Sequence, residues 1–133
     1  MSNSQHPRLL NGLALAYMGD AVYELAIREH LISKGQTKPH MLHRLATEYV
    51  SAKGQAYLSD KFQEQDKLTD EEWDYFKRGR NAKSHSKAKN ADTQTYSQST
   101  GFEALMGYLY LTDQHERLNE LIIWCIDRIE EKQ

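Results

Sequence analysis

The sequence predicts an all-α helical bundle, and three observations favour this fold class. Apolar residues recur at the three- and four-residue spacing of helices along most of the chain. The alternation of β-branched residues that is typical of strands is missing, and prolines occur only at Pro7 and Pro39. The chain has 133 residues, of which 39% are hydrophobic and 27% charged, enough for one domain with a buried core. We therefore expect a single domain over residues 1–133.

The N-terminal half predicts two long helices. The first runs from about Leu9 to Ile32, with one face made of Leu13, Tyr17, Asp20, Glu24, Ile27 and Leu31. Gly35 suits the position after its C-terminus, and Pro39 suits the first turn of the next helix. A break near Gly54 is expected in this second helix, whose apolar residues are Met41, Leu42, Leu45, Tyr49, Tyr57 and Leu58.

Two Thr-x-x-Glu patterns in the C-terminal half resemble capping boxes, which open helices. The pattern at Thr69–Glu72 predicts a helix through Phe76, and the pattern at Thr100–Glu103 predicts a helix over residues 102–111. A last amphipathic helix is expected over residues 116–130. The segment Gly79–Ser99 is polar and almost free of aliphatic residues, which predicts a long loop of a kind that is usually functional or mobile.

Composition excludes several classes of protein. Lys and Arg number 17 against 19 Asp and Glu, so the net charge of −2 argues neither for nor against nucleic acid. The single Cys125 excludes an intramolecular disulfide and a cysteine-cluster zinc site. The N-terminus lacks the pattern of a signal peptide, and the longest charge-free stretches, residues 9–19 and 104–112, are too short to span a bilayer. We therefore expect a soluble, cytoplasmic protein.

Two acidic residues lie in strongly apolar helical surroundings, Asp20 in LALAYMGDAVYELAI and Glu103 in GFEALMGYLYL. A helix that is apolar on all sides is buried, and an unpaired carboxylate there is costly. A divalent metal ion between the two acids would satisfy both. The alternatives are a groove position or an ion pair for Asp20, and a capping role for Glu103 in the Thr100 pattern. Glu24, one turn beyond Asp20, either assists the site or is solvated at its rim.

A basic segment from Tyr75 to Ala91 is the second candidate, because it contains no acidic residue. A cluster of Lys and Arg with Asn and Ser donors suits contacts with the phosphate backbone of nucleic acid. The alternative is a basic loop that is merely solvated. The candidate binding residues are Lys77, Arg78, Arg80, Asn81, Lys83, Lys87 and Lys89.

Three blocks of this sequence resemble the ribonuclease III family. NGLALAYMGDA at residues 11–21 resembles the signature helix of the family, which ends in Leu-Gly-Asp, and GFEALMG at 101–107 resembles its second metal-binding helix. RGRNAKS at 78–84, with KNAD at 89–92 and QTY at 94–96, is similar to the Mini-ribonuclease III branch, whose chains lack a double-stranded-RNA-binding domain. The resemblance extends from Leu10 to about Ile126.

The resemblance implies a ribonuclease III-like endonuclease domain that cuts double-stranded RNA with Mg²⁺. Asp20 matches the catalytic Asp of the signature and Glu103 the catalytic metal-binding Glu, so both are expected metal ligands. Ala16 and Thr100 stand where the wider family has two more carboxylates, as in the Mini-ribonuclease III branch. The metal ion would activate a water molecule and offset the charge of the transition state. The basic segment would grip RNA in place of the missing domain.

The family also implies a homodimer, in which two sites face the two strands of a duplex. The apolar residues on every face of Leu9–Ile27 agree with this, because they exceed what one small core buries. The implied biological role is maturation of the ends of precursor large-subunit (23S) ribosomal RNA. The alternative function is a non-catalytic module on the same fold that binds double-stranded RNA or the ribosome. Loss of the two family carboxylates favours this alternative, whereas retention of Asp20 and Glu103 argues against it.

Overall fold

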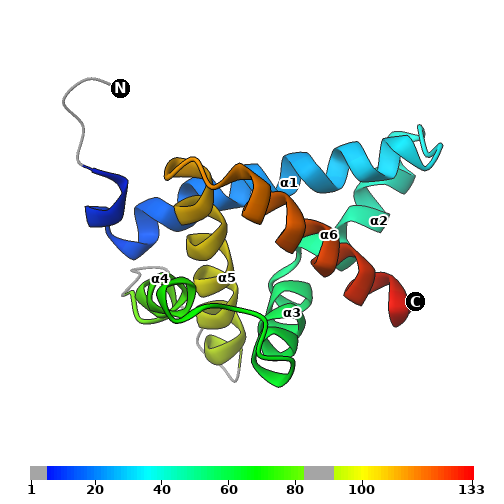
Figure 1. The fold of residues 1–133 in the computed structure, drawn as a ribbon. Helices are drawn as coiled ribbons and strands as arrows, with labels where there is room; N and C mark the ends of the chain where they lie inside the picture. Colours follow the sequence, from blue (N-terminus) through cyan, green and yellow to red (C-terminus); the bar gives the residue numbers. More distant parts are fainter. Residues whose placement is uncertain (1–5, 83–91) are drawn as a thin grey trace.

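A computed structural model describes residues 6–82 and 92–133 and confirms the all-α fold class (Figure 1). Within these residues the chain forms one short 3-10 helix and six α-helices, and no strand is present. In chain order these elements are η1 (Pro7–Leu9), α1 (Gly12–Ser33), α2 (Pro39–Val50), α3 (Ala52–Glu64), α4 (Asp70–Arg80), α5 (Thr93–Leu111) and α6 (His115–Glu131).

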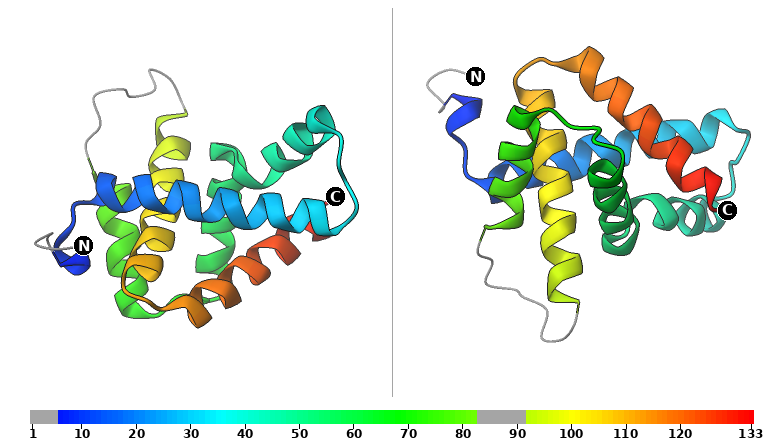
Figure 2. Two further views of the ribbon diagram at one scale, coloured as in Figure 1. Left: turned by 90° about the horizontal axis from the view of Figure 1, so that it is seen from above. Right: turned by 60° about the horizontal axis from the view of Figure 1, so that its bottom comes forward.

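Helix α5 is the centre of the bundle, because it packs against α1, α3, α4 and α6. It lies between α3 and α4, and α1 crosses its C-terminal half (Figures 1 and 2). Its buried side chains form the middle of the hydrophobic core, which explains why the C-terminal part of α5 is apolar on nearly all sides. They include Phe102, Leu105, Met106, Tyr108 and Leu109.

Two glycines allow α1 and α5 to touch through their backbones. A Cβ atom on Gly19 would lie 1.7 Å from the carbonyl oxygen of Glu103, and one on Gly107 would lie 1.9 Å from the carbonyl oxygen of Leu15. Any side chain at either position would therefore force the helices apart. Because Asp20 follows Gly19, this crossing brings it next to the turn of α5 that carries Glu103.

The break expected near Gly54 in the second predicted helix is confirmed, and it lies at Ser51. Ser51 ends α2 and also caps α3, where its side-chain oxygen accepts a hydrogen bond of 3.0 Å from the amide of Gly54. Gly54 is buried inside α3. A serine that caps the following helix competes with continuation of the preceding one, which explains the earlier break.

The capping box at Thr69 and Glu72 is confirmed, with reciprocal hydrogen bonds of 2.9 and 3.1 Å. The box predicted at Thr100 and Glu103 is wrong. Thr100 lies inside α5, and its hydroxyl donates to the carbonyl oxygen of Tyr96 at 3.0 Å. Thr100→Ala therefore removes no helix cap. Glu103 therefore does not cap a helix, which was the alternative to a metal-binding role.

The long loop predicted over Gly79–Ser99 is wrong at both ends, because α4 continues to Arg80 and α5 starts at Thr93. The first turns of α5 lack aliphatic residues, yet they are helical. The reason is that α5 packs closely against α4 here, and only small residues fit into this contact. The Cα of Gly101 lies 3.1 Å from the Cβ position of Gly79, and Ser99 and Thr100 are buried beside it.

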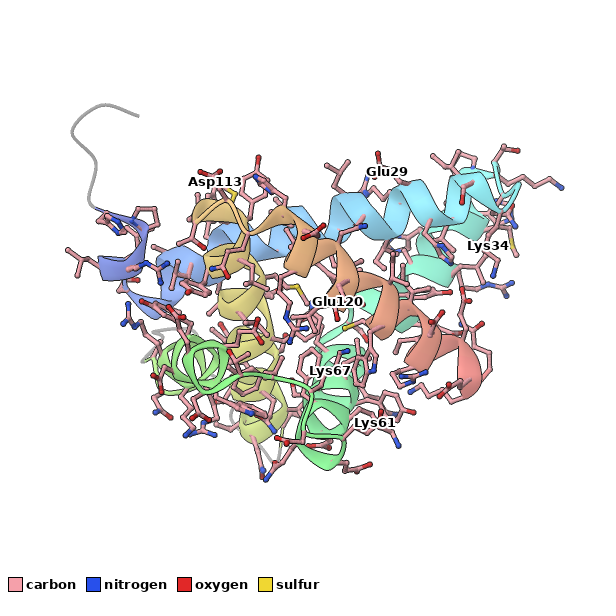
Figure 3. The ribbon with its side chains drawn as sticks, viewed as in Figure 1. Glu29, Lys34, Lys61, Lys67, Asp113 and Glu120 are labelled. Atoms are coloured by element: carbon pink, nitrogen blue, oxygen red, sulfur yellow. The ribbon has the colours of Figure 1, made fainter. Side chains whose placement is uncertain are left out.

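Ion pairs fasten α6 and the preceding loops to the bundle. Arg117 donates to both carboxylate oxygens of the buried Glu72 at 2.8 Å and to the carbonyl oxygen of Lys67 at 2.8 Å. Lys67 in turn pairs with Glu120 at 3.6 Å, and Figure 3 shows these two side chains on neighbouring segments. Among residues 6–82 and 92–133, no helix combines the length and apolar character that crossing a membrane requires.

Glu130 on α6 joins the C-terminal half of α1 to α2. Its carboxylate accepts hydrogen bonds from His30 at 2.7 Å, Tyr49 at 2.8 Å and Lys34 at 3.1 Å. Burial alone would raise the pKa of Glu130, but the three hydrogen bonds outweigh it and lower the pKa to about 2. The ionised form is therefore the one that stabilises the fold.

Glu130→Gln is expected to lower the free energy of unfolding at pH 7 by about 1–2 kcal/mol, allowing for the 27% exposure of the side chain. The folded pKa lies below the unfolded one, so this difference is complete above about pH 4.5 and shrinks as the pH falls towards 2. Urea unfolding at pH 7 and pH 3 measures it. Glu29→Gln is the control, because Glu29 is exposed and its side chain forms no ion pair among the described residues. An equal loss at both pH values would contradict a charge effect.

Candidate active site

The crossing of α1 and α5 brings together the two acids singled out in the sequence. The carboxyl groups of Asp20 and Glu103 lie close enough together for Asp20 to raise the pKa of Glu103. The expectation that both are buried is wrong for Asp20, which is exposed, whereas Glu103 is half-buried. The reason is that the single chain leaves one side of α1 uncovered at this point. The pair therefore has a rigid, inner member and an outer member that faces solvent.

The electrostatics of this pair favour binding of a cation. Burial raises the pKa of Glu103, and the neighbouring carboxyl of Asp20 raises it further, to about 8. At neutral pH the bare pair therefore holds a proton that two separate carboxyls would release. A divalent cation bound between the two carboxylates would offset their negative charge as the proton does, but with two positive charges instead of one.

The donor set fits magnesium rather than zinc. Among the described parts of the chain, no three His, Cys, Asp or Glu side chains come close enough to hold a metal ion together. Mg²⁺ is commonly held by one or two carboxylates, with water and substrate phosphates as its other ligands. The acid pair is therefore sufficient for Mg²⁺, and its exposed side is accessible to a phosphate group.

Other polar residues near the pair do not join it. Glu24 forms an ion pair of 3.1 Å with Arg28 and lines a cavity of about 290 Å³ between α1 and α2. Ala16 and Thr100 are both buried, and the hydroxyl of Thr100 is used by the backbone of its own helix. The two positions where the family often has acids thus supply no ligand here.

Sequence reasoning missed one residue, Gln55 on α3, whose amide contributes to the environment of Glu103. Gln55 is 1% exposed. The signal was present but weak: Gln55 interrupts the buried face of α3 that otherwise carries Leu58 and Phe62. Polar residues at such positions need a partner in the core, but the periodicity of one helix does not identify it.

The candidate RNA-binding residues divide into two groups. Lys77, Arg78 and Arg80 lie in the last turn of α4, and Asn81 follows as its C-cap. Lys83, Lys87 and Lys89 lie outside the described residues. The basic turn lies close to the acid pair, because a Cβ on Gly79 would be 2.5 Å from the side chain of Ala104, the residue after Glu103.

Arg78 also has a structural role that the sequence did not predict. Its guanidinium donates to the carbonyl oxygens of Arg8 at 2.7 Å and Leu10 at 2.9 Å, and it lies 4.5 Å from the ring centre of Tyr75. It therefore ties the segment before α1 to α4. Substitution of Arg78 would disturb this attachment as well as any contact with phosphate.

An apolar surface lies on α1 beside Asp20. Leu13 is 40% exposed, Tyr17 84% and Leu25 61%, and their spacing places them along one side of the helix. Leu9, just before α1, is 73% exposed. Large apolar side chains grouped in this way on a small domain are typical of a protein interface.

Comparison with protein families gives a match over residues 13–114, more than half of the chain, to the Ribonuclease III domain. A Mini-ribonuclease 3 of Enterococcus faecalis is 63% identical over 122 residues, which cover 92% of each chain. A Mini-ribonuclease 3 of Staphylococcus aureus is 49% identical over 134 residues, which cover 99% of this chain and 100% of that one.

The fold also matches a solved structure. A crystal structure of a protein from Fusobacterium nucleatum superimposes with a TM-score of 0.80 and 29% sequence identity. The match covers 93% of this chain and 99% of that one. The helices that carry the acid pair therefore belong to an arrangement that a crystallised protein shares.

Proposed function

Because the chain belongs to the ribonuclease III family, and within it to the Mini-ribonuclease III branch, it is an endoribonuclease, and we propose that it cleaves double-stranded RNA with magnesium. The observation that carries the proposal is the convergence of Asp20 and Glu103 at the crossing of α1 and α5. Two carboxylates on separate, closely packed helices form a site that is fixed by the fold. We propose that they are its metal-binding and catalytic residues.

Bound magnesium would supply electrophilic stabilisation of the phosphate and a more acidic water molecule for hydrolysis. The chain itself supplies the anchoring. Glu103 is held in the packed centre of α5, whereas Asp20 is exposed and leaves one side of the site open to RNA. The basic turn of α4 lies beside this opening and would hold the phosphate backbone.

The expected biological substrate is the double-stranded end region of precursor 23S ribosomal RNA, as the resemblance to Mini-ribonuclease III implies, and the expected location is the cytoplasm. A duplex presents two strands, whereas one chain has one acid pair among its described residues. We therefore propose a homodimer formed through the apolar side of α1.

Incubation of the purified protein with a long double-stranded RNA tests the function directly. Cleavage with Mg²⁺, none with EDTA and recovery on adding Mg²⁺ again are expected. Binding of the duplex without cleavage under any divalent cation would instead favour the non-catalytic module. Precursor 23S RNA and a duplex of unrelated sequence, compared at equal concentration, test the proposed substrate.

The homodimer gives a second prediction. Sedimentation at micromolar concentration is expected to show twice the mass of the 15.5 kDa chain. Tyr17→Glu should shift the protein towards monomer, because it places a charge in an interface that excludes water. Ile123→Glu is the matched control, since Ile123 is a large apolar residue, 52% exposed, that lies on α6 rather than on α1. A monomeric parent protein would contradict the prediction.

The basic segment gives a third prediction, on RNA affinity rather than chemistry. Neutralising Lys77 and Arg80 together with Lys83, Lys87 and Lys89, by Gln substitution, should weaken binding and reduce its salt dependence. Each lost phosphate contact is expected to lower the log–log slope by about one unit. The cleavage rate at saturating RNA should survive, because the acid pair is untouched.

Arg78 is left unchanged in this design, because it holds the segment before α1. Lys132→Gln is the control for loss of a positive charge, since it lies at the C-terminal end of α6, far from α4 in Figures 1 and 2. Binding measured at several salt concentrations, in an Asp20→Asn background that prevents cleavage, gives the slope. An unchanged affinity and slope would show that the segment is only solvated.

A further inference from the structure

Gln55 on α3 is buried against α5, beside Ser99, and Ser99 lies one helical turn before Glu103. Its side-chain oxygen accepts a hydrogen bond of 2.5 Å from the hydroxyl of Ser99. Ser99 precedes Glu103 by four residues, so the two side chains lie on the same face of α5. Gln55 is therefore held by one end of its amide, next to the helix face that carries the acid.

The other end of this amide is unsatisfied. The Nε2 group of Gln55 is buried and has no hydrogen-bond partner of normal geometry among the described residues. It nevertheless lies close enough to Glu103 to favour the ionised carboxylate. An unpaired buried N–H group is costly, and its persistence in a packed core indicates that a partner is supplied when the site is in use.

The orientation of the amide follows from the chemistry of its neighbours. With a metal ion bound, Glu103 would be ionised and would only accept hydrogen bonds, so it would need the NH₂ end of Gln55 rather than the oxygen. In this orientation the Ser99 hydroxyl donates to the oxygen and leaves the NH₂ group free to face Glu103. If the amide turned over, its oxygen would face the carboxylate oxygens and repel them.

We propose that Gln55 is a positioning residue, whose amide N–H holds the carboxylate of Glu103 in its metal-binding orientation while Ser99 holds the amide. The inference rests on the proposed function, because it assigns Glu103 to a metal site. Partners that orient a metal ligand in this way typically change metal affinity by about 10–100-fold when they are removed.

Gln55→Met tests the proposal, because it keeps the length of the side chain and removes the donor. Binding of Mn²⁺ to the metal-free protein, measured by calorimetry, is expected to weaken about 10–100-fold. The Mg²⁺ concentration for half-maximal cleavage should rise by a similar factor, with the rate recovering at high Mg²⁺. A purely structural role of Gln55 would lower thermal stability without this shift in metal affinity.

Ser99→Ala and Ser59→Ala complete the design. Ser99→Ala keeps Gln55 in place but frees its amide to turn over, so a smaller loss of metal affinity in the same direction is expected. Ser59→Ala is the matched control, because Ser59 is also a buried serine, on α3, and its hydroxyl donates to the carbonyl oxygens of Gln55 and Gln98 rather than to a side chain. It should bind metal as the parent does.

Wild-type metal affinity in both Gln55→Met and Ser99→Ala overturns the proposal. If Gln55→Met does not fold, Ser99→Ala decides alone, since it preserves the volume of Gln55. Failure of the proposed function has a different signature. In that case the parent protein neither binds Mn²⁺ nor cleaves duplex RNA, whereas failure of the positioning role leaves a parent that does both.

Discussion

Asp20→Asn is expected to abolish cleavage of double-stranded RNA while the protein stays folded. Loss of a metal-binding carboxylate removes several kcal/mol of transition-state stabilisation, which at about 1.36 kcal/mol per factor of ten corresponds to a rate loss on the order of 10³-fold or more. Single-turnover cleavage at saturating RNA and fixed Mg²⁺ measures this loss. Glu103→Gln should behave in the same way.

The fold should tolerate the change because Asp20 is exposed and asparagine has nearly the same shape. Its thermal stability is expected to equal or exceed that of the parent. The reason is that Asp20 disfavours ionisation of Glu103, and the neutral amide relieves this repulsion. The pKa of Glu103 should therefore fall from about 8 towards the usual range in this variant.

Glu24→Gln is the matched control for Asp20→Asn. Both changes replace an acid by its amide on the same helix, one turn apart, but Glu24 pairs with Arg28 and does not contact Glu103. Its cleavage rate should stay within a few-fold of the parent rate. Near-parental cleavage by folded Asp20→Asn would end the assignment of the metal site, and equal losses in both variants would show that charge on α1, rather than the pair, matters.

The parts of the fold that could be predicted from the sequence are those whose signal is local. Helix α1 and the capping box of α4 both depend on residues within a few positions of one another, and both are confirmed. The face expected for α1 is wrong in its N-terminal half, where Leu13, Tyr17 and Asp20 are exposed. The buried side there is formed by Leu15, Ala16, Gly19 and Tyr23, because apolar residues lie on every side of this helix. The start of α5 was missed because its small and polar residues indicate a loop locally. Their helical packing depends on Gly79, which is distant in sequence and adjacent in space.

The candidate site, like the fold, could be predicted from the sequence only where the signal is local. The apolar surroundings of Asp20 and Glu103 were sufficient to single out both acids, and their convergence follows from a close helix crossing. The exposure of Asp20 was not predictable, because the same apolar pattern covers the core side of α1 and the side that the chain leaves open. The contact of Gln55 with this site depends on long-range packing of α3 against α5 and has no local pattern.

Gly107→Ala is expected to destabilise the fold strongly. The new Cβ would lie 1.9 Å from the carbonyl oxygen of Leu15, whereas real Cβ atoms essentially never come within 3.0 Å of such an atom. Both sides of the contact are helix backbone, so no side chain can turn away and the helices must separate. Overpacking typically costs about 1–3 kcal/mol, and we expect this variant to lie at or above the top of that range.

The same separation should also damage the candidate site. Gly107 follows Glu103 by one turn, and Asp20 follows Gly19 at the same crossing, so moving α1 away from α5 moves the two carboxyls apart. Glu103 should then titrate closer to the usual range of a carboxyl, because part of the increase in its pKa comes from Asp20. Metal affinity and cleavage should fall even at temperatures where the variant remains folded.

Urea unfolding, Mn²⁺ calorimetry and cleavage on the same preparation of Gly107→Ala test both effects together. Gly35→Ala is the control, because Gly35 has open space around its Cβ position and a φ of +95°. It should lose about 1 kcal/mol from backbone strain alone and bind metal normally. Parental stability of Gly107→Ala would contradict the backbone contact at the crossing. Lower stability with unchanged metal affinity would show that the acid pair does not depend on how closely α1 and α5 approach.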